Sequence, residues 1–126
     1  MQFMNLLMII MLFVIPVIAL LIGMRTKNNP PKNINKIVGY RTARSMASQE
    51  AWDYANRRCG EMMYKGGIYT LIAGVVGTII ILLAKLSEDV VVVSIIVTVV
   101  LLLQTILLIF PMRTIEKELR DEAYKK

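Results

Sequence analysis

The side chains best suited to chemistry lie in one basic stretch of the chain, residues 25–65. Arg41 and Arg44 stand three residues apart within it. A guanidinium group is planar, always charged and rich in donors, which suits two-point contact with a phosphate or a carboxylate. Three neighbouring polar residues could complete an anion-binding pocket with the two arginines: Thr42, Ser45 and Asn56.

The arrangement of Arg41 and its polar neighbours is compatible with three roles for Arg41. Its guanidinium could bond backbone carbonyls or Glu50 and so fix the loop onto the helix that follows. It could instead hold a lipid phosphate, or it could contact a protein partner. Because the chain has no histidine to act as a general base, we expect Arg41 and its neighbours to bind rather than to catalyse.

Composition excludes most of the common catalytic templates. The chain has no histidine and a single cysteine, Cys59. A Ser-His-Asp triad, a histidine-ligated zinc site, a multi-cysteine metal cluster and an internal disulfide therefore cannot form. Ser45 and Ser48 have no obvious base beside them, and serine is a common N-cap residue. We expect no enzyme activity, no metal and no cofactor.

Three long apolar blocks flank this stretch and must position it. Residues 1–24, 66–85 and 90–112 contain only one charged residue, Lys85. Each is long enough for a bilayer core, which needs about 20 apolar residues. The first block lacks a basic start and a clear cleavage site, so it is predicted to be an uncleaved span. The sequence predicts an all-α membrane protein with three transmembrane helices.

The basic residues predict how the chain is oriented in the cell membrane. The connection 25–65 holds nine Lys and Arg against three acids, whereas the turn 85–89 holds one Lys and two acids. Basic connections stay on the cytoplasmic side. We therefore expect the connection 25–65 and the charged tail 113–126 to be cytoplasmic, and the N-terminus to be outside.

Small and polar residues predict how the spans pack. Small residues on one stripe let helices approach closely in lipid. Spans 2 and 3 are expected to form a hairpin with Gln104 facing protein, and Pro16 to bend the first span where a neighbouring helix satisfies the freed carbonyl. Homo-dimerisation through the stripe is an alternative. The stripe of span 2 has four-residue spacing: Gly66, Thr70, Gly74 and Thr78.

An amphipathic helix is predicted ahead of the second span. Ser48 suits its N-cap, and Trp52 lies on an apolar face opposite a charged face that includes Arg57. Such a helix typically lies at the headgroup level. We expect it to lie there and then to turn into the span at Gly66 and Gly67.

The same stretch resembles the signature of the SdpI/YfhL family of bacterial membrane proteins, in the short form with three spans. The resemblance implies an immunity protein that guards its producer against a secreted toxic peptide. It also implies a signalling partner that holds a transcriptional repressor at the membrane. The matching residues are Val38, Gly39, Tyr40, Arg41, Thr42, Ser45, Ser48, Glu50, Trp52, Ala55, Asn56 and Arg57.

Two rival functions fit the same sequence. The first is a small membrane enzyme or binder that acts on lipid phosphate headgroups, with Arg41 and Arg44 as the phosphate clamp. The second is a pore former or scaffold. The three blocks contain no acidic residue, which excludes a proton-coupled small-multidrug exporter. The basic residues are spread beside predicted membrane, so lipid headgroups rather than nucleic acid are the expected partners.

Overall fold

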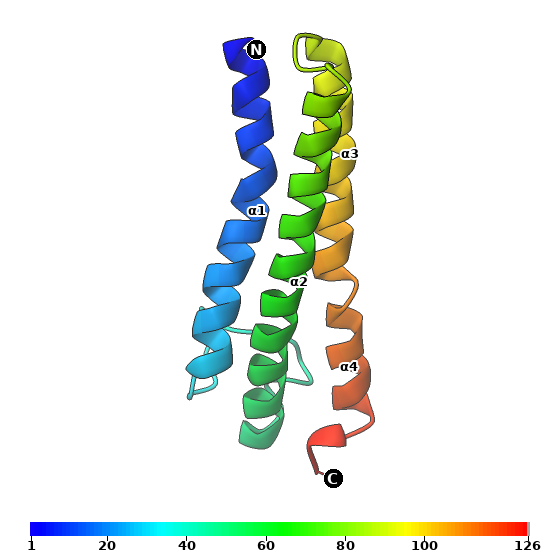
Figure 1. The fold of residues 1–126 in the computed structure, drawn as a ribbon. Helices are drawn as coiled ribbons and strands as arrows, with labels where there is room; N and C mark the ends of the chain where they lie inside the picture. The colour runs from blue at the N-terminus through cyan, green and yellow to red at the C-terminus, as the bar shows by residue number, and fades with distance from the viewer. Residues whose placement is uncertain (126) are drawn as a thin grey trace.

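The computed structural model describes residues 1–125 as a bundle of three long helices with a short fourth helix (Figure 1). The three long helices are apolar and long enough to cross a bilayer, which confirms the predicted all-α membrane fold. The elements are α1 (Phe3–Asn28), α2 (Gln49–Leu83), α3 (Val90–Ile109), α4 (Met112–Arg120) and a 3-10 turn, η1 (Ala123–Lys125).

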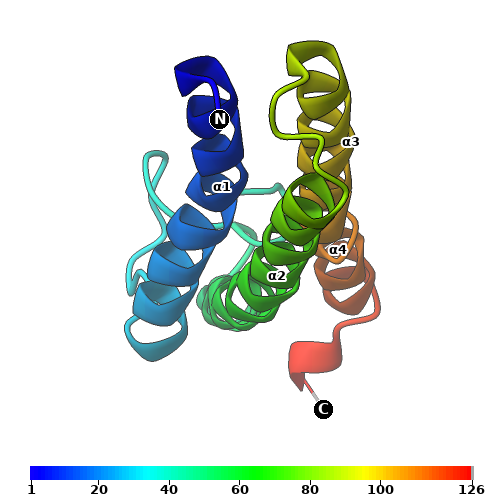
Figure 2. The same cartoon turned by 45° about the horizontal axis from the view of Figure 1, so that its top comes forward.

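The two ends of the bundle differ in what they carry. At one end, which we call the turn end, the N-terminus lies beside the α2–α3 connection (Figure 2). There the Asn5 side chain donates a 2.6 Å hydrogen bond to the Ser87 carbonyl, and the Met1 ammonium lies 2.5 Å from Glu88. The connection between α1 and α2 lies with α4 at the opposite end, the loop end. The predicted alternation of the connections between two sides is therefore present in the fold.

The second helix continues without a break through the point where a turn was expected. The amphipathic segment is helical, but α2 runs from Gln49 to Leu83 and the prediction of a turn at Gly66 and Gly67 is wrong. Both glycines serve close packing instead. A Cβ on Gly66 would lie 2.8 Å from Leu108, and one on Gly67 would lie 2.8 Å from Leu20.

Gln104 joins all three long helices in the middle of the bundle. Pro16 has no N–H, so the Leu12 carbonyl four residues earlier has no donor in its own helix. The Gln104 side-chain amide donates to that carbonyl over 2.9 Å and to the Thr70 carbonyl over 2.8 Å. Gly74 makes room, because a Cβ there would lie 3.0 Å from the Leu12 oxygen. The prediction that Gln104 faces protein is confirmed.

Two further glycines, which the sequence reasoning missed, set the contact between α1 and α2. A Cβ on Gly23 would lie 2.4 Å from the Tyr64 nitrogen, and one on Gly60 would lie 2.4 Å from the Lys27 nitrogen. The predicted stripe is used inside the chain, so a second copy would have to pack on another face. Gly66, Thr70 and Gly74 are buried, and Thr78 is half-buried.

Candidate functional site

The loop end folds into one packed unit, which we call the loop module: the connection 29–48, the first half of α2 (residues 49–65) and α4. Trp52 is fully buried at its centre, and its ring nitrogen donates to the Pro31 carbonyl over 2.7 Å. A tryptophan in a membrane protein often lies at the headgroup level. Here it is buried and holds the loop onto α2, and its expected position at the headgroup level stays a prediction.

Gly39 and Asn56 lock the loop beside this tryptophan. Gly39 has a φ of +112°, and a Cβ there would lie 2.5 Å from the Asn56 side-chain oxygen. The Tyr40 amide donates to that oxygen over 2.7 Å, while the Asn56 amide donates to the Trp52 carbonyl over 3.0 Å. Only glycine adopts this φ without strain, so the Gly-Tyr step and Asn56 are fitted to one another.

Hydroxyl groups close the next turn of the loop. Ser45 is fully buried; its Oγ accepts from the Thr42 amide over 2.8 Å and donates to the Tyr40 carbonyl over 2.8 Å. Ser48 accepts from the Ala51 amide over 3.1 Å, which confirms the predicted N-cap of α2. These hydroxyls are therefore engaged in holding backbone.

α4 docks on the first half of α2 through small and branched apolar side chains. Ile115 and Leu119, four residues apart, are buried against Ala51 and Ala55 of α2. The four-residue spacing places both side chains on one face of α4. The tail that was expected only to carry charge is thus an integral part of the loop module.

Glu118 fixes α4 from one side. Arg58 makes a two-point contact with it, through Nε over 3.1 Å and Nη2 over 2.9 Å, and also pairs with Glu61 over 3.0 Å. The Tyr54 hydroxyl donates to Glu118 over 2.7 Å. The bonds from Arg58 hold the pKa of Glu118 below its usual range, although burial acts in the opposite direction.

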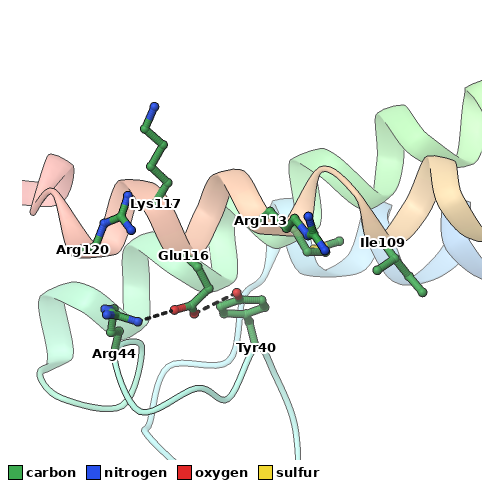
Figure 3. Close-up of a pocket in the computed structure, with 8 residues that line it drawn as sticks. Tyr40, Arg44, Ile109, Arg113, Glu116, Lys117 and Arg120 are labelled. Carbon is green, nitrogen blue, oxygen red and sulfur yellow. Dashed lines mark hydrogen bonds and ion pairs between the residues drawn. The ribbon is translucent and has the colours of Figure 1, made fainter.

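Glu116 fixes α4 from the other side (Figure 3). The Tyr40 hydroxyl donates to one carboxylate oxygen over 2.9 Å, and Arg44 lies 3.3 Å from the other. Burial raises the pKa of Glu116, but hydrogen bonds from Thr42, Tyr40 and Arg44 outweigh it and leave the pKa lowered. Burial and the bond to Glu116 raise the pKa of the Tyr40 hydroxyl.

The structure does not assemble the polar pocket expected from the sequence. Ser45 and Asn56 are sealed inside the loop, and Arg44 turns to Glu116. Arg41 is exposed and donates to the Lys36 carbonyl within the same loop, so this bond does not fix the loop onto α2. Arg57 lies exposed on α2. The motif therefore builds a scaffold that leaves Arg41 and Arg57 at its surface.

A shallow pocket of about 420 Å³ opens where α3 meets α4 (Figure 3). We call it the α3–α4 pocket. Ile109 and Met112 form its apolar side. The sequence reasoning missed it because its cations are spread through the tail, although the spacing of Ile115 and Leu119 could have revealed α4. Its polar side is lined by Tyr40, Arg44, Arg113, Glu116, Lys117 and Arg120.

Comparison with known proteins identifies the family. The model of the SdpI/YfhL protein family matches residues 32–114, which include most of the connection, all of α2 and α3, and the first three residues of α4. A Bacillus subtilis (strain 168) protein described as "Uncharacterized protein YfhL" is 41% identical over 58 residues, or 46% of this chain and 51% of the relative. That alignment spans about half of the relative's length. No solved structure matches the chain. On the family match, the chain belongs to the SdpI/YfhL protein family.

Proposed function

We propose that this protein is an immunity protein that protects the cell membrane against a membrane-active toxic peptide, and that it acts by binding without catalysis. Membership of the SdpI/YfhL family supports the proposal, since the resemblance of the motif implies protection. The use of Thr42 and Ser45 as structural hydroxyls also supports binding over catalysis. Burial raises the pKa of the Cys59 thiol, which makes it a poor nucleophile.

One observation carries the proposal: the family motif presents an exposed, partly apolar tip on a rigid base. Ile37 is 83% exposed and Val38 is 59% exposed, beside the exposed Arg41. The next residue, Gly39, is locked against Asn56. We call residues 36–41 the loop tip. Apolar side chains with a cation, held in a fixed loop, suit recognition of another polypeptide.

The test is protection of a sensitive bacterial host that expresses the chain and is challenged with a membrane-active peptide. Wild-type protein should raise the peptide concentration needed to kill the host. Arg41→Ala and the double variant I37S/V38S should abolish this protection while the amount of protein in the membrane stays normal. Lys65→Ala removes an exposed cation of α2 outside the loop tip and should protect as well as wild type.

Two results would contradict the proposal. Failure of the wild-type chain to protect against any peptide tested would remove the immunity function. Full protection by both loop-tip variants would leave immunity standing but would exclude the loop tip as its working surface.

The loop tip also favours a second role, the holding of a regulator at the membrane. The connection that carries it has the chain's main excess of basic residues, which supports a cytoplasmic position. A photoreactive amino acid in place of Ile37 would separate the two roles in living cells. Crosslinking to added toxic peptide supports immunity by direct contact, whereas crosslinking to a DNA-binding repressor supports sequestration.

A further inference from the structure

We infer that the α3–α4 pocket binds the phosphate headgroup of an anionic membrane lipid. The inference is independent of the proposed immunity function, and the lining of the pocket does not include Ile37, Val38 or Arg41 of the loop tip. The pocket lies where the third apolar helix ends at Ile109 and the basic helix α4 begins at Met112. A lipid phosphate lies at this level of a bilayer, at the boundary of the hydrocarbon core.

The charge of the pocket favours an anion. Four cationic side chains line it against one carboxylate, and that carboxylate, Glu116, already accepts from Tyr40 and lies 3.3 Å from Arg44. Within residues 1–125, Arg113 and Lys117 have no carboxylate within 4.0 Å, so their charges are free for a ligand. Basic pockets beside membrane helices are typical sites for anionic headgroups.

The side chains are arranged around the pocket in a way that suits a headgroup. In Figure 3, Arg44 and Arg120 lie on one side of Glu116 and Arg113 lies on the other, beside Ile109. Lys117 extends outward from α4. A phosphate held at Arg113 would therefore have its lipid tail directed toward the apolar side of the pocket.

The apolar side distinguishes a lipid from a free phosphate ion. Ile109 is 61% exposed and Phe110 is 66% exposed at the end of the span. The Arg113 guanidinium lies 5.8 Å from the centre of the Phe110 ring. A free phosphate ion has no apolar surface to bury against Ile109 and Phe110, whereas the acyl chains of a lipid gain binding free energy by packing against them. The volume of about 420 Å³ is also in the range of small-molecule sites, about 300–1,000 Å³.

The experiment uses the full chain in detergent micelles and titrates short-chain phosphatidylglycerol, with thermal unfolding followed by the fluorescence of the single tryptophan, Trp52. Phosphatidylglycerol should raise the unfolding temperature and saturate. Phosphatidylcholine and inorganic phosphate at the same concentrations should raise it much less. Native mass spectrometry should show one retained phosphatidylglycerol per chain.

Two double variants with the same loss of charge locate the site. R113Q/K117Q removes the two unpaired cations of the pocket and should weaken phosphatidylglycerol binding about thirtyfold, since each basic residue near an anionic surface contributes roughly fivefold. R57Q/K65Q removes one Arg and one Lys from exposed positions of α2 at the same end of the bundle. This control should bind phosphatidylglycerol within about twofold of wild type.

Three outcomes would overturn the inference. Equal weakening by both double variants would mean that the basic residues attract anionic lipid only through the overall positive charge of this end of the bundle, and not through a specific pocket. Equal stabilisation by phosphatidylcholine would mean that the pocket does not distinguish an anionic headgroup from a zwitterionic one. Equal stabilisation by inorganic phosphate, lost in R113Q/K117Q, would show an anion site that does not select lipid.

Discussion

The side-chain amide of Gln104 on α3 donates a 2.9 Å hydrogen bond to the backbone carbonyl of Leu12 on α1. This carbonyl is the one deprived of its helical donor by Pro16. The bilayer core contains no water that could replace the missing donor. A proline in one span and a glutamine in another, 88 residues later in the sequence, are therefore two halves of one contact.

Gln104→Leu should lower the free energy of unfolding in micelles by about 1–2 kcal/mol, because the Leu12 carbonyl is left without a donor. In a Pro16→Ala background the same substitution should cost less, because residue 16 then supplies the donor itself. The measurement is a double-mutant cycle by equilibrium unfolding. Thr105→Val, which removes a hydroxyl bonded within α3, is the control. Strictly additive effects of the Gln104 and Pro16 changes would contradict the pairing.

Gly23→Ala and Gly60→Ala should each destabilise the bundle by about 1–3 kcal/mol, since the new methyl group would meet backbone atoms of the facing helix. Gly66→Ala is the matched comparison and should cost less. The one close contact of its methyl group would be with the end of the flexible Leu108 side chain, since the nearest backbone atom, the Leu107 oxygen, would lie 3.7 Å away. Unfolding in micelles gives all three values. If Gly66→Ala proved the most harmful, the close approach of α1 to α2 described above would be wrong.

Gly39→Ala should release the loop from α2. The left-handed φ costs a side chain about 1–3 kcal/mol, and the methyl group would lie against the Asn56 oxygen. Because Trp52 is the single tryptophan and is buried by this loop, its fluorescence should shift to the red. Ile37→Ala, at an exposed position of the same loop, should leave the spectrum unchanged. An unshifted Gly39→Ala spectrum would mean that the loop tolerates the methyl group.

Docking of α4 should weaken in acid. The pKa values of Glu116 and Glu118 are lowered in the folded protein, from an ordinary value of 4.5. Their contribution to stability is therefore complete above that value and is lost as the pH falls through the lowered pKa values. Hydrogen exchange of the α4 amides, corrected for intrinsic rates between about pH 7 and about pH 3, should show this loss.

The double variant E116Q/E118Q supplies the control for this pH dependence. Its α4 should exchange faster than wild type at neutral pH and should respond little to acid, since both titrating groups are gone. Equal acid responses in wild type and E116Q/E118Q would assign the effect to other carboxylates.

The membrane architecture could be predicted because it depends on local properties of the sequence. Long uncharged blocks specify spanning helices through length and hydropathy alone. The continuity of α2 could not be predicted in this way. The pair Gly66 and Gly67 is compatible with either a turn or a close helix contact, and only the positions of Leu108 and Leu20 in space decide between them.

The contacts within the loop module could not be predicted from the sequence. The sequence singled out Gly39, Trp52 and Asn56, but their contacts with one another depend on how the loop returns to α2. Glu116 and Glu118 lie more than 50 residues from Tyr40 and Arg58, so no local spacing connects them. Long-range ion pairs of this kind follow from the packing of α4.

Because α2 is unbroken, the loop end and the membrane span share one continuous helix and are expected to move together. Its 35 residues measure about 52 Å at 1.5 Å per residue, against about 30 Å for the hydrocarbon core. About 20 Å of stiff helix therefore extend beyond the hydrocarbon core, with Trp52 near the far end. A change of about 10° in the tilt of the span would displace that end by about 4 Å. A perturbation of the bilayer that changes the tilt of α2 would therefore also displace the loop tip.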